Sequence, residues 1–167
     1  GKVQTSFAYK ENRPVIFMFP GQGAQYVNMG LDLYKTEPVF RREMDRCFKV
    51  LKSLMGYDVK EILYPSSTGS NTSNTSHSSY NIDNTEIAQP LMFVFQYALA
   101  KLLMHWGIEA EAMTGHSIGE YTAACLNGVF SLGDALALVV FRGKIMQKAP
   151  GGVMVSVPMA EGELMPL

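Results

Sequence analysis

The chain has 167 residues, enough for one domain with a sizeable core, and 47% of them are hydrophobic, as in ordinary globular proteins. Its 14 Lys and Arg residues against 15 Asp and Glu residues give a net charge of −1, which offers no support for a nucleic-acid partner. We expect no apolar run to be long enough to span a bilayer, and the polar first residues do not resemble a secretory signal. The three histidines show no metal-ligand spacing. We therefore expect a cytoplasmic protein with no membrane partner and no metal.

The first segments in chain order are a polar stretch, a strand and a glycine-rich loop. Residues 1–13 are polar and mixed in charge, and we interpret them as a linker or the tail of a preceding segment. The unbroken apolar run at 15–19 is long enough for a buried parallel strand. The loop at 20–25, PGQGAQ, has two glycines, which let the backbone approach a ligand closely and leave its N–H groups available as donors.

An amphipathic helix is predicted next. Its apolar residues recur at helical spacing with charges between them, and Gly56 is expected to end it; they are Phe40, Met44, Cys47, Phe48 and Leu51. The two cysteines of the chain, Cys47 and Cys125, both fall in helical patterns. We expect them to be buried, free thiols rather than a disulfide.

Residues 66–85 differ from the rest because they are poor in apolar residues and rich in Ser, Thr and Asn. Such a composition cannot bury a core and predicts a mobile surface loop. We expect Pro90 to open the following helix, since a proline suits the first helical turn. The many apolar residues from Leu91 to Trp106 predict burial of this helix on more than one face.

The segment at 115–120 reads GHSIGE and lies between a short stretch at 112–114, which we expect to end a strand, and a helical pattern at 121–126. A serine on a sharp strand-to-helix turn exposes its hydroxyl at the helix N-terminus. The helix dipole and the free N–H groups favour negative charge developing there. Ser117 is therefore a candidate nucleophile, and the alternative is an ordinary glycine turn with a capping serine.

The last predicted elements are a helix, a strand and the start of a further helix. Ser131 to Asp134 resembles a capping box, and the helix is expected to run to about Lys148. Arg142 falls on its apolar stripe, where a guanidinium must be paired or reach solvent. A strand is expected at 153–157. Strands alternating with long helices predict a parallel α/β architecture.

Four segments together resemble one family: FPGQGAQ at 19–25, IAQP at 87–90, GHSIGE at 115–120 and FRGKIMQ at 141–147. In order and spacing they are similar to the acyltransferase family that includes malonyl-CoA:acyl carrier protein transacylase, and more closely to acyltransferase domains of modular polyketide synthases. The resemblance runs from about Pro14 to the C-terminus. It implies an α/β-hydrolase-like large subdomain with a parallel sheet and an inserted ferredoxin-like small subdomain. The implied organisation is a linker from an upstream segment at 1–13, the N-terminal part of the large subdomain at 14–150, and the start of the small subdomain at 151–167.

The resemblance also assigns roles to site residues. It makes Ser117 the nucleophile and places the backbone N–H groups of Gln22 and Ile118 in the oxyanion hole. Gln89 matches a substrate-site position, although a plain polar residue before a helix explains it equally well. We expect His116 to shape the site by hydrogen bonding. The family's catalytic histidine lies far downstream of the serine, and no position here matches it, so we expect this chain alone to be inactive.

Arg142 carries the substrate prediction. In the family this arginine binds the free carboxylate of a malonyl-type acyl group, and the alternative is a structural ion pair with a protein carboxylate. Ile118 is typical of malonyl-selecting members, whereas glutamine at that position is typical of methylmalonyl-selecting ones. The implied reaction moves the acyl group from malonyl-CoA, or a related dicarboxylic acyl-CoA, through Ser117 to the phosphopantetheine thiol of an acyl carrier protein. No cofactor is expected to be bound, and neighbouring polyketide synthase domains are expected partners.

Three other interpretations remain open at this stage. The chain is also compatible with a free-standing transacylase of fatty-acid synthesis. A serine thioesterase or esterase would share the serine turn, but not GQGAQ or the inward-facing Arg142. A non-catalytic scaffold fragment would keep the fold without acylation of Ser117.

Overall fold

The computed structural model describes residues 5, 13–65, 80–150, 152 and 157–164. Three expectations therefore lie wholly or mainly outside the described residues. They are the linker at 1–13, the Ser/Thr/Asn-rich loop at 66–85 and the strand at 153–157.

Two short strands form a parallel pair. β1 (Ile16–Phe19) and β2 (Ala112–Gly115) align in register from Ile16 opposite Ala112 to Phe19 opposite Gly115. Parallel neighbours need a long crossover, and here the crossover consists of helices α1 to α4. The first two of the three predicted strands and the α/β class are therefore confirmed.

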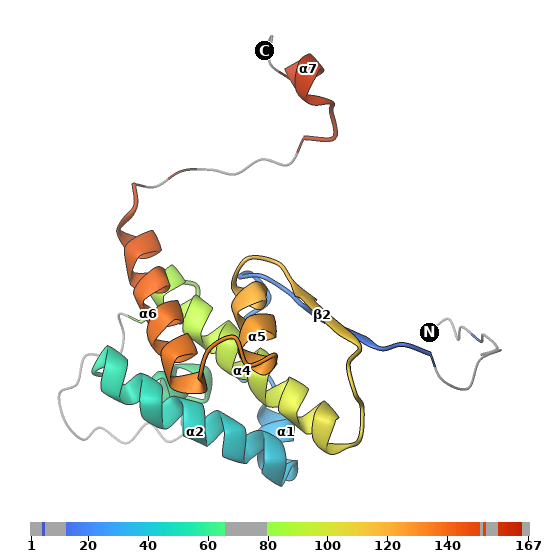
Figure 1. Ribbon diagram of the computed structural model, residues 1–167. Helices are drawn as coiled ribbons and strands as arrows, with labels where there is room; N and C mark the ends of the chain where they lie inside the picture. Colours follow the sequence, from blue (N-terminus) through green and yellow to red (C-terminus); the bar gives the residue numbers. More distant parts are fainter. Residues whose placement is uncertain (1–4, 6–12, 66–79, 151, 153–156, 165–167) are drawn as a thin grey trace.

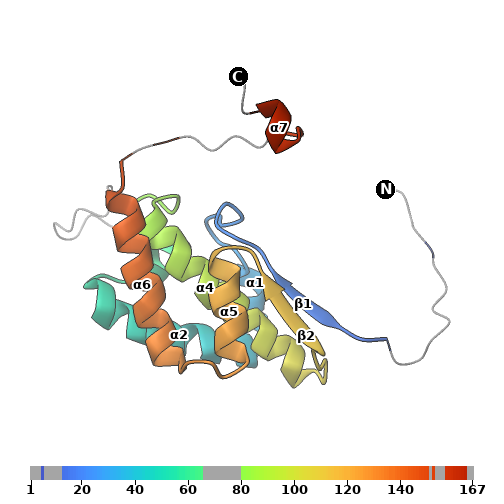
Figure 2. The same ribbon diagram turned by 45° about the horizontal axis from the view of Figure 1, so that its top comes forward.

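Only one face of β1 is buried among the described residues. Phe17 and Phe19 point into the core, whereas Ile16 and Met18 are 57% and 78% exposed. The apolar run predicts a buried strand, and among the described residues this holds for one face of β1 only. The reason is that the helices cover one side of the strand pair, which lies at an edge of the molecule beside α5 (Figure 2).

The helices pack around α4, which contacts α2, α5 and α6 (Figure 1). Side chains from these helices form the main hydrophobic core, with Phe40, Met44 and Phe93 among its largest fully buried members. The helices are α1 (Leu31–Thr36), α2 (Pro38–Met55), α3 (Val59–Leu63), α4 (Thr85–His105), α5 (Ile118–Leu126), α6 (Leu132–Lys148) and α7 (Glu161–Leu164).

Local sequence signals explain the ends of α2 and α6, and the C-terminus of α2 and both ends of α6 lie where they were predicted. α2 has Pro38 in its first turn and ends at Gly56, whose φ of 82° suits a residue without a Cβ. α6 begins after Ser131, whose Oγ accepts the N–H of Asp134 at 3.2 Å, and it ends at Lys148.

The start of α4 differs from the prediction. The helix begins at Thr85, and Pro90 lies inside it. Pro90 has no N–H to donate to the carbonyl one turn earlier, but the first turn is held by other groups. Thr85 N–H donates to Gln147 Oε1 on α6 at 2.6 Å, and Ala88 N–H donates to the carbonyl of Asn84 at 2.8 Å. The acceptor on Gln147 comes from a distant part of the sequence, so the local pattern could not reveal it.

By length and composition alone, α4 is apolar enough to cross a membrane, with a mean hydropathy of 1.4 over its best window. The sequence-based expectation that no such run exists is therefore wrong. However, 72% of that window is buried inside the protein, which is the situation of a core helix.

Both cysteines are free and buried, as expected. Burial, with a further contribution from Glu43, raises the pKa of the Cys47 thiol to about 12. This thiol is therefore un-ionised and poorly reactive at neutral pH.

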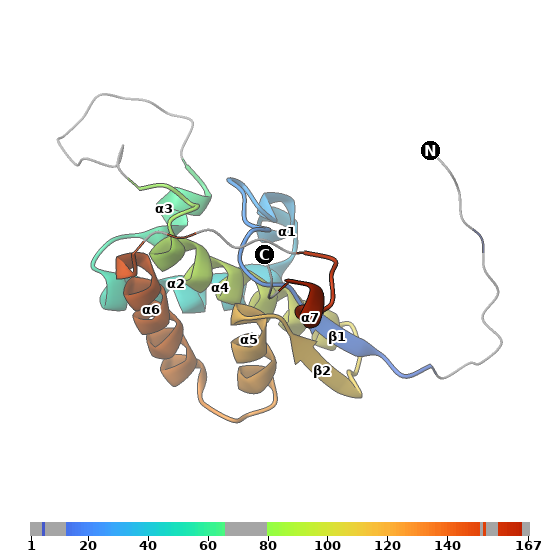
Figure 3. The ribbon, with the colours of Figure 1, turned by 90° about the horizontal axis from the view of Figure 1, so that it is seen from above.

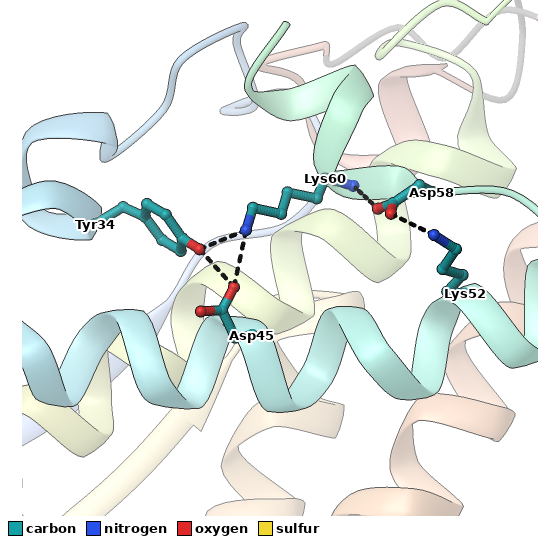
Figure 4. A network of polar contacts seen from close by, with 5 residues as sticks. All are labelled: Tyr34, Asp45, Lys52, Asp58 and Lys60. Atoms are coloured by element: carbon teal, nitrogen blue, oxygen red, sulfur yellow. Dashed lines mark hydrogen bonds and ion pairs between the residues drawn. The ribbon is translucent and has the colours of Figure 1, made fainter. Parts of the chain in front are cut away.

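A polar network joins α1, α2 and α3 at the surface (Figure 4). Lys60 Nζ lies 2.6 Å from Tyr34 Oη and 3.1 Å from Asp45 Oδ1, and Tyr34 donates to the same carboxylate at 2.5 Å. Asp58 caps α3 and accepts a hydrogen bond from Lys52 at 2.9 Å. Figure 3 shows that α3 lies next to α2 and α4.

Candidate active site

Ser117 occupies the turn between β2 and α5. Its φ of 53° and ψ of −113° lie in a region that side-chain-bearing residues rarely adopt. The side chain is exposed and does not cap α5. The strained backbone thus presents the hydroxyl at the helix N-terminus instead of using it in the fold.

The two glycines that flank Ser117 make this turn possible. A Cβ on Gly115 would lie 2.1 Å from the carbonyl carbon of Gly119, and one on Gly119 would lie 2.3 Å from the carbonyl oxygen of Phe19. Any larger residue would push the turn away from the end of β1.

Glu120 also holds the turn, although sequence reasoning gave it no role. Its Oε1 accepts the N–H of Gly115 at 2.7 Å, which ties the start of α5 to the end of β2. A charged residue directly after the turn, at the start of an otherwise apolar helix, is the signal that could have identified it.

The two predicted oxyanion donors have free N–H groups. Gln22 lies in the loop after β1, and Ile118 is the first residue of α5. Among the described residues, neither backbone N–H donates to a protein acceptor. Both are therefore available to an external oxyanion.

Arg142 contacts Ser117 directly. Its Nη2 donates to Ser117 Oγ at 3.0 Å, and its Nη1 donates to Gln89 Oε1 at 2.5 Å. The guanidinium carbon also lies 5.4 Å from the centre of the Tyr121 ring. In the described ranges no carboxylate lies within ion-pair distance of this half-buried cation.

Gln89 connects Arg142 to the loop after β1. It is 1% exposed and lies inside α4 rather than ahead of it. Its Nε2 lies 3.4 Å from Gln22 Oε1 and 3.1 Å from Met146 Sδ. One continuous chain of side-chain contacts therefore runs from Ser117 in the β2–α5 turn through Arg142 on α6 and Gln89 on α4 to Gln22 in the loop.

His116 lies beside this chain of contacts. Its backbone N–H donates to the carbonyl of Phe19 at 2.9 Å, and its exposed ring packs against Gly21, where a Cβ would come within 2.5 Å of Nδ1. In the described part of the protein the ring makes no hydrogen bond, so its contact with the loop is one of packing.

Two further glutamines, which sequence reasoning left without a role, hold the surrounding backbone. Gln25 Oε1 accepts the N–H of Gly23 at 2.8 Å, and its Nε2 donates to Asp83 at 2.9 Å. Gln147 accepts the first N–H of α4, as described above. Both belong to the motifs GQGAQ and FRGKIMQ, but the spacing of those motifs does not reveal their partners.

A hollow of about 330 Å³ lies at the carboxyl ends of the two strands, next to His116. It is lined by Met18, Phe19, Pro20, Thr114, Gly115 and His116. Within the described ranges, no group of three or more His, Cys, Asp and Glu side chains is arranged to hold a metal ion.

The fold and the Ser117 turn define an α/β protein with an exposed serine at a strand–helix junction. The sequence profile of the family described as "Acyl transferase domain" matches residues 16–165, and the chain belongs to this family. The resemblance drawn from the four sequence motifs is thereby confirmed.

Curated relatives are polyketide synthases and similar enzymes. The chain is 41% identical over 148 residues to polyketide synthase GfsA of Streptomyces halstedii, covering 88% of this chain and 2% of that protein. It is 38% identical over 153 residues to the mycoketide-CoA synthase of Mycobacterium tuberculosis, covering 91% of this chain and 3% of that protein. The chain thus spans less than a tenth of the length of these two relatives.

Solved structures of acyl transferases also resemble the chain. The acyl transferase domain of ZmaA superposes with a TM-score of 0.84 at 48% identity, covering 98% of this chain and 36% of that one. The malonyl-CoA:ACP transacylase of Synechocystis sp. PCC 6803 superposes with a TM-score of 0.65 at 31% identity, covering 84% of this chain and 42% of that one.

Proposed function

We propose that this chain supplies the nucleophile, the oxyanion donors and the carboxylate-binding arginine for acyl transfer in polyketide biosynthesis. The acyl donor is malonyl-CoA or a related dicarboxylic acyl-CoA, and the acceptor is the phosphopantetheine thiol of an acyl carrier protein. The observation that carries the proposal is the contact of Arg142 with Ser117, because this arginine has no carboxylate partner among the described residues.

In the first half-reaction, Ser117 Oγ attacks the thioester carbonyl while a general base takes its proton. The N–H groups of Gln22 and Ile118 stabilise the oxyanion of the tetrahedral intermediate. Collapse of the intermediate breaks the C–S bond, and coenzyme A leaves as the thiol after it takes the proton back from the base. The acyl group stays on Ser117 as an ester.

In the second half-reaction, the carrier thiol loses its proton to the base and attacks the ester carbonyl. The same two N–H groups stabilise the second oxyanion. Its collapse breaks the ester bond to Ser117 Oγ, which takes the proton back from the base, and leaves the acyl group on the carrier thiol as a thioester. The general base is proposed to be a histidine from another part of the full-length protein, since no position in this chain matches the one used by the family.

Arg142 is proposed to bind the free carboxylate of the acyl group. A guanidinium can form two parallel hydrogen bonds with a carboxylate, which fixes both the identity and the orientation of the acyl group. Gln89 holds the guanidinium on its other side, and His116 is proposed to contact the substrate at the strand ends. No bound cofactor is required, and a cytoplasmic location near the other synthase domains is proposed.

The test is to incubate the full-length protein with malonyl-CoA and to map the adduct by peptide mass spectrometry. We expect a malonyl ester on Ser117 that disappears in Ser117→Ala and that passes to a carrier protein when one is added. An adduct on another residue, or normal loading of Ser117→Ala, would contradict the assignment. Release of the acyl group to water in the presence of carrier protein would indicate a thioesterase instead.

A further inference from the structure

Gln96 is a buried polar residue in the middle of α4, outside the chain of contacts that links Ser117 to Gln22. It is 5% exposed, and its Nε2 donates to the carbonyl oxygen of Pro20 at 2.7 Å. Its Oε1 accepts from Oγ1 of Thr122, a fully buried residue, at 2.9 Å. Because the Pro20 carbonyl can only accept, the orientation of the Gln96 amide is fixed by its two partners.

These two partners belong to the two backbone segments that matter most for the proposed reaction. Pro20 begins the loop that carries the N–H of Gln22. Thr122 lies one helical turn after Ile118 on α5, the helix whose first N–H is the second proposed donor. One side-chain amide therefore bridges the two halves of the proposed oxyanion hole.

The loop at 20–25 depends on such side chains. Among the backbone hydrogen bonds of the described residues outside helices and strands, none involves this loop. Side chains of other elements hold it instead: Gln96 contacts the Pro20 carbonyl, and Asp83 contacts the side chain of Gln25. Thr85 and Gln89 contact the side chain of Gln22, at 3.2 and 3.4 Å. Of these contacts, only the one from Gln96, a buried side chain of α4, reaches the backbone of the loop from another element.

We propose that Gln96, oriented by Thr122, is a positioning residue for the oxyanion hole. It fixes the loop from Pro20 to Gln22 against α5, so that the N–H groups of Gln22 and Ile118 are in place before the acyl group arrives. Oxyanion stabilisation requires donors that need no rearrangement during the reaction, and small displacements reduce it strongly. This inference rests on the acyl-transfer function proposed above.

The direct test is Gln96→Met in the full-length protein, since methionine keeps the length and volume but removes both hydrogen bonds. We expect the single-turnover rate of Ser117 acylation, and kcat, to fall by about 10- to 100-fold, less than the loss for a deleted oxyanion donor. KM for the acyl-CoA should change by less than about threefold, because the lost interaction acts in the transition state.

A second pair of variants keeps the test independent of how well Gln96→Met folds. Thr122→Ser retains the hydroxyl and should acylate at close to the wild-type rate. Thr122→Val removes it, frees the Gln96 amide to turn, and should lower kcat by several-fold with KM unchanged. Equal rates for Thr122→Ser and Thr122→Val, both folded, would overturn the proposal.

Val94→Ala provides the matched control, because Val94 is fully buried on the same helix and bonds to no loop residue. We expect it to lower the Tm while leaving kcat near that of the wild type. If Gln96→Met loses no more kcat than Val94→Ala at a comparable Tm, Gln96 is merely structural and the proposal is overturned. If the wild type itself forms no adduct on Ser117, the proposed function fails first, and the role of Gln96 falls with it.

Discussion

At the scale of single residues, the charge of Arg142 needs an explanation. A half-buried guanidinium is costly unless it is paired, yet its partners here are a hydroxyl, an amide and an aromatic ring. Each of these is neutral, so the positive charge is solvated but not neutralised by the described residues. An anionic group next to Ser117 would neutralise this charge, which is the role proposed above for the malonyl carboxylate.

Arg142→Ala should therefore discriminate between acyl groups in the full-length protein. We expect malonyl transfer to weaken by about 2–5 kcal/mol, the range for truncating one partner of a buried charge pair. Acetyl transfer should be unchanged or faster, since the unneutralised cation has gone. Loading of Ser117 from malonyl-CoA and from acetyl-CoA is measured in the folded wild type and the folded variant.

Lys148→Ala is the control, because it removes an exposed cation at the end of the same helix, and it should change loading from neither substrate. An equal loss for both acyl groups in Arg142→Ala would make it a structural residue.

At the scale of elements, the β2–α5 turn joins sheet and helix with almost no free space. Gly119→Ala would place a methyl group 2.3 Å from the Phe19 carbonyl oxygen, so either the turn or the end of β1 must move. We expect a loss of about 1–3 kcal/mol in the free energy of unfolding, typical of overpacking, together with a loss of Ser117 acylation. Denaturant unfolding of the full-length protein and single-turnover loading measure the two effects.

Gly133→Ala is the matched control for that substitution. Gly133 lies in the first turn of α6, and a Cβ there would be 3.8 Å from its nearest neighbour, Ser131 Oγ. Alanine is a better helix former than glycine, so this variant should be neutral or more stable by up to about 1 kcal/mol. If Gly119→Ala behaves like Gly133→Ala, the close packing of the turn is not what requires glycine at 119.

The same elements show how far local sequence reasoning reaches. The C-terminus of α2 and the N-terminus of α6 were predicted because Gly56 and Ser131 act within their own turns. The start of α4 was missed because its first N–H finds an acceptor on Gln147, far along the chain. The same limit applies to the candidate active site. The motifs pointed to Ser117 and Arg142, but only the packing of α4 against α6 reveals that Gln89 lies between Arg142 and Gln22. Gln96 was missed because one glutamine in an apolar helix carries no periodic signal.

At the scale of the whole molecule, two apolar surfaces lack a cover among the described residues. One is the outer face of β1, with Ile16 and Met18. The other lies along α6, where Phe141 and Ile145, one helical turn apart, are both exposed. Neighbouring exposed apolar side chains of this kind mark surfaces that pack against another part of a protein. The chain covers only 36% of the solved ZmaA acyl transferase domain.

We therefore predict that residues 1–167 by themselves do not sustain acyl transfer. They contain the proposed nucleophile and both oxyanion donors, but no histidine at the family's position for the base. The uncovered faces of β1 and α6 should also make the isolated chain self-associate, which light scattering over a concentration series would detect. Transfer to a carrier protein is compared between the isolated chain and the full-length protein at equal Ser117 concentration, with Ser117→Ala as the blank.

Sustained turnover by the isolated chain would place the general base within this chain. His116 would then be the first residue to test, since it neighbours Ser117 and its ring makes no hydrogen bond among the described residues. If His116→Ala abolished that turnover, the general base would be His116, and the proposal that the base comes from another part of the full-length protein would be wrong.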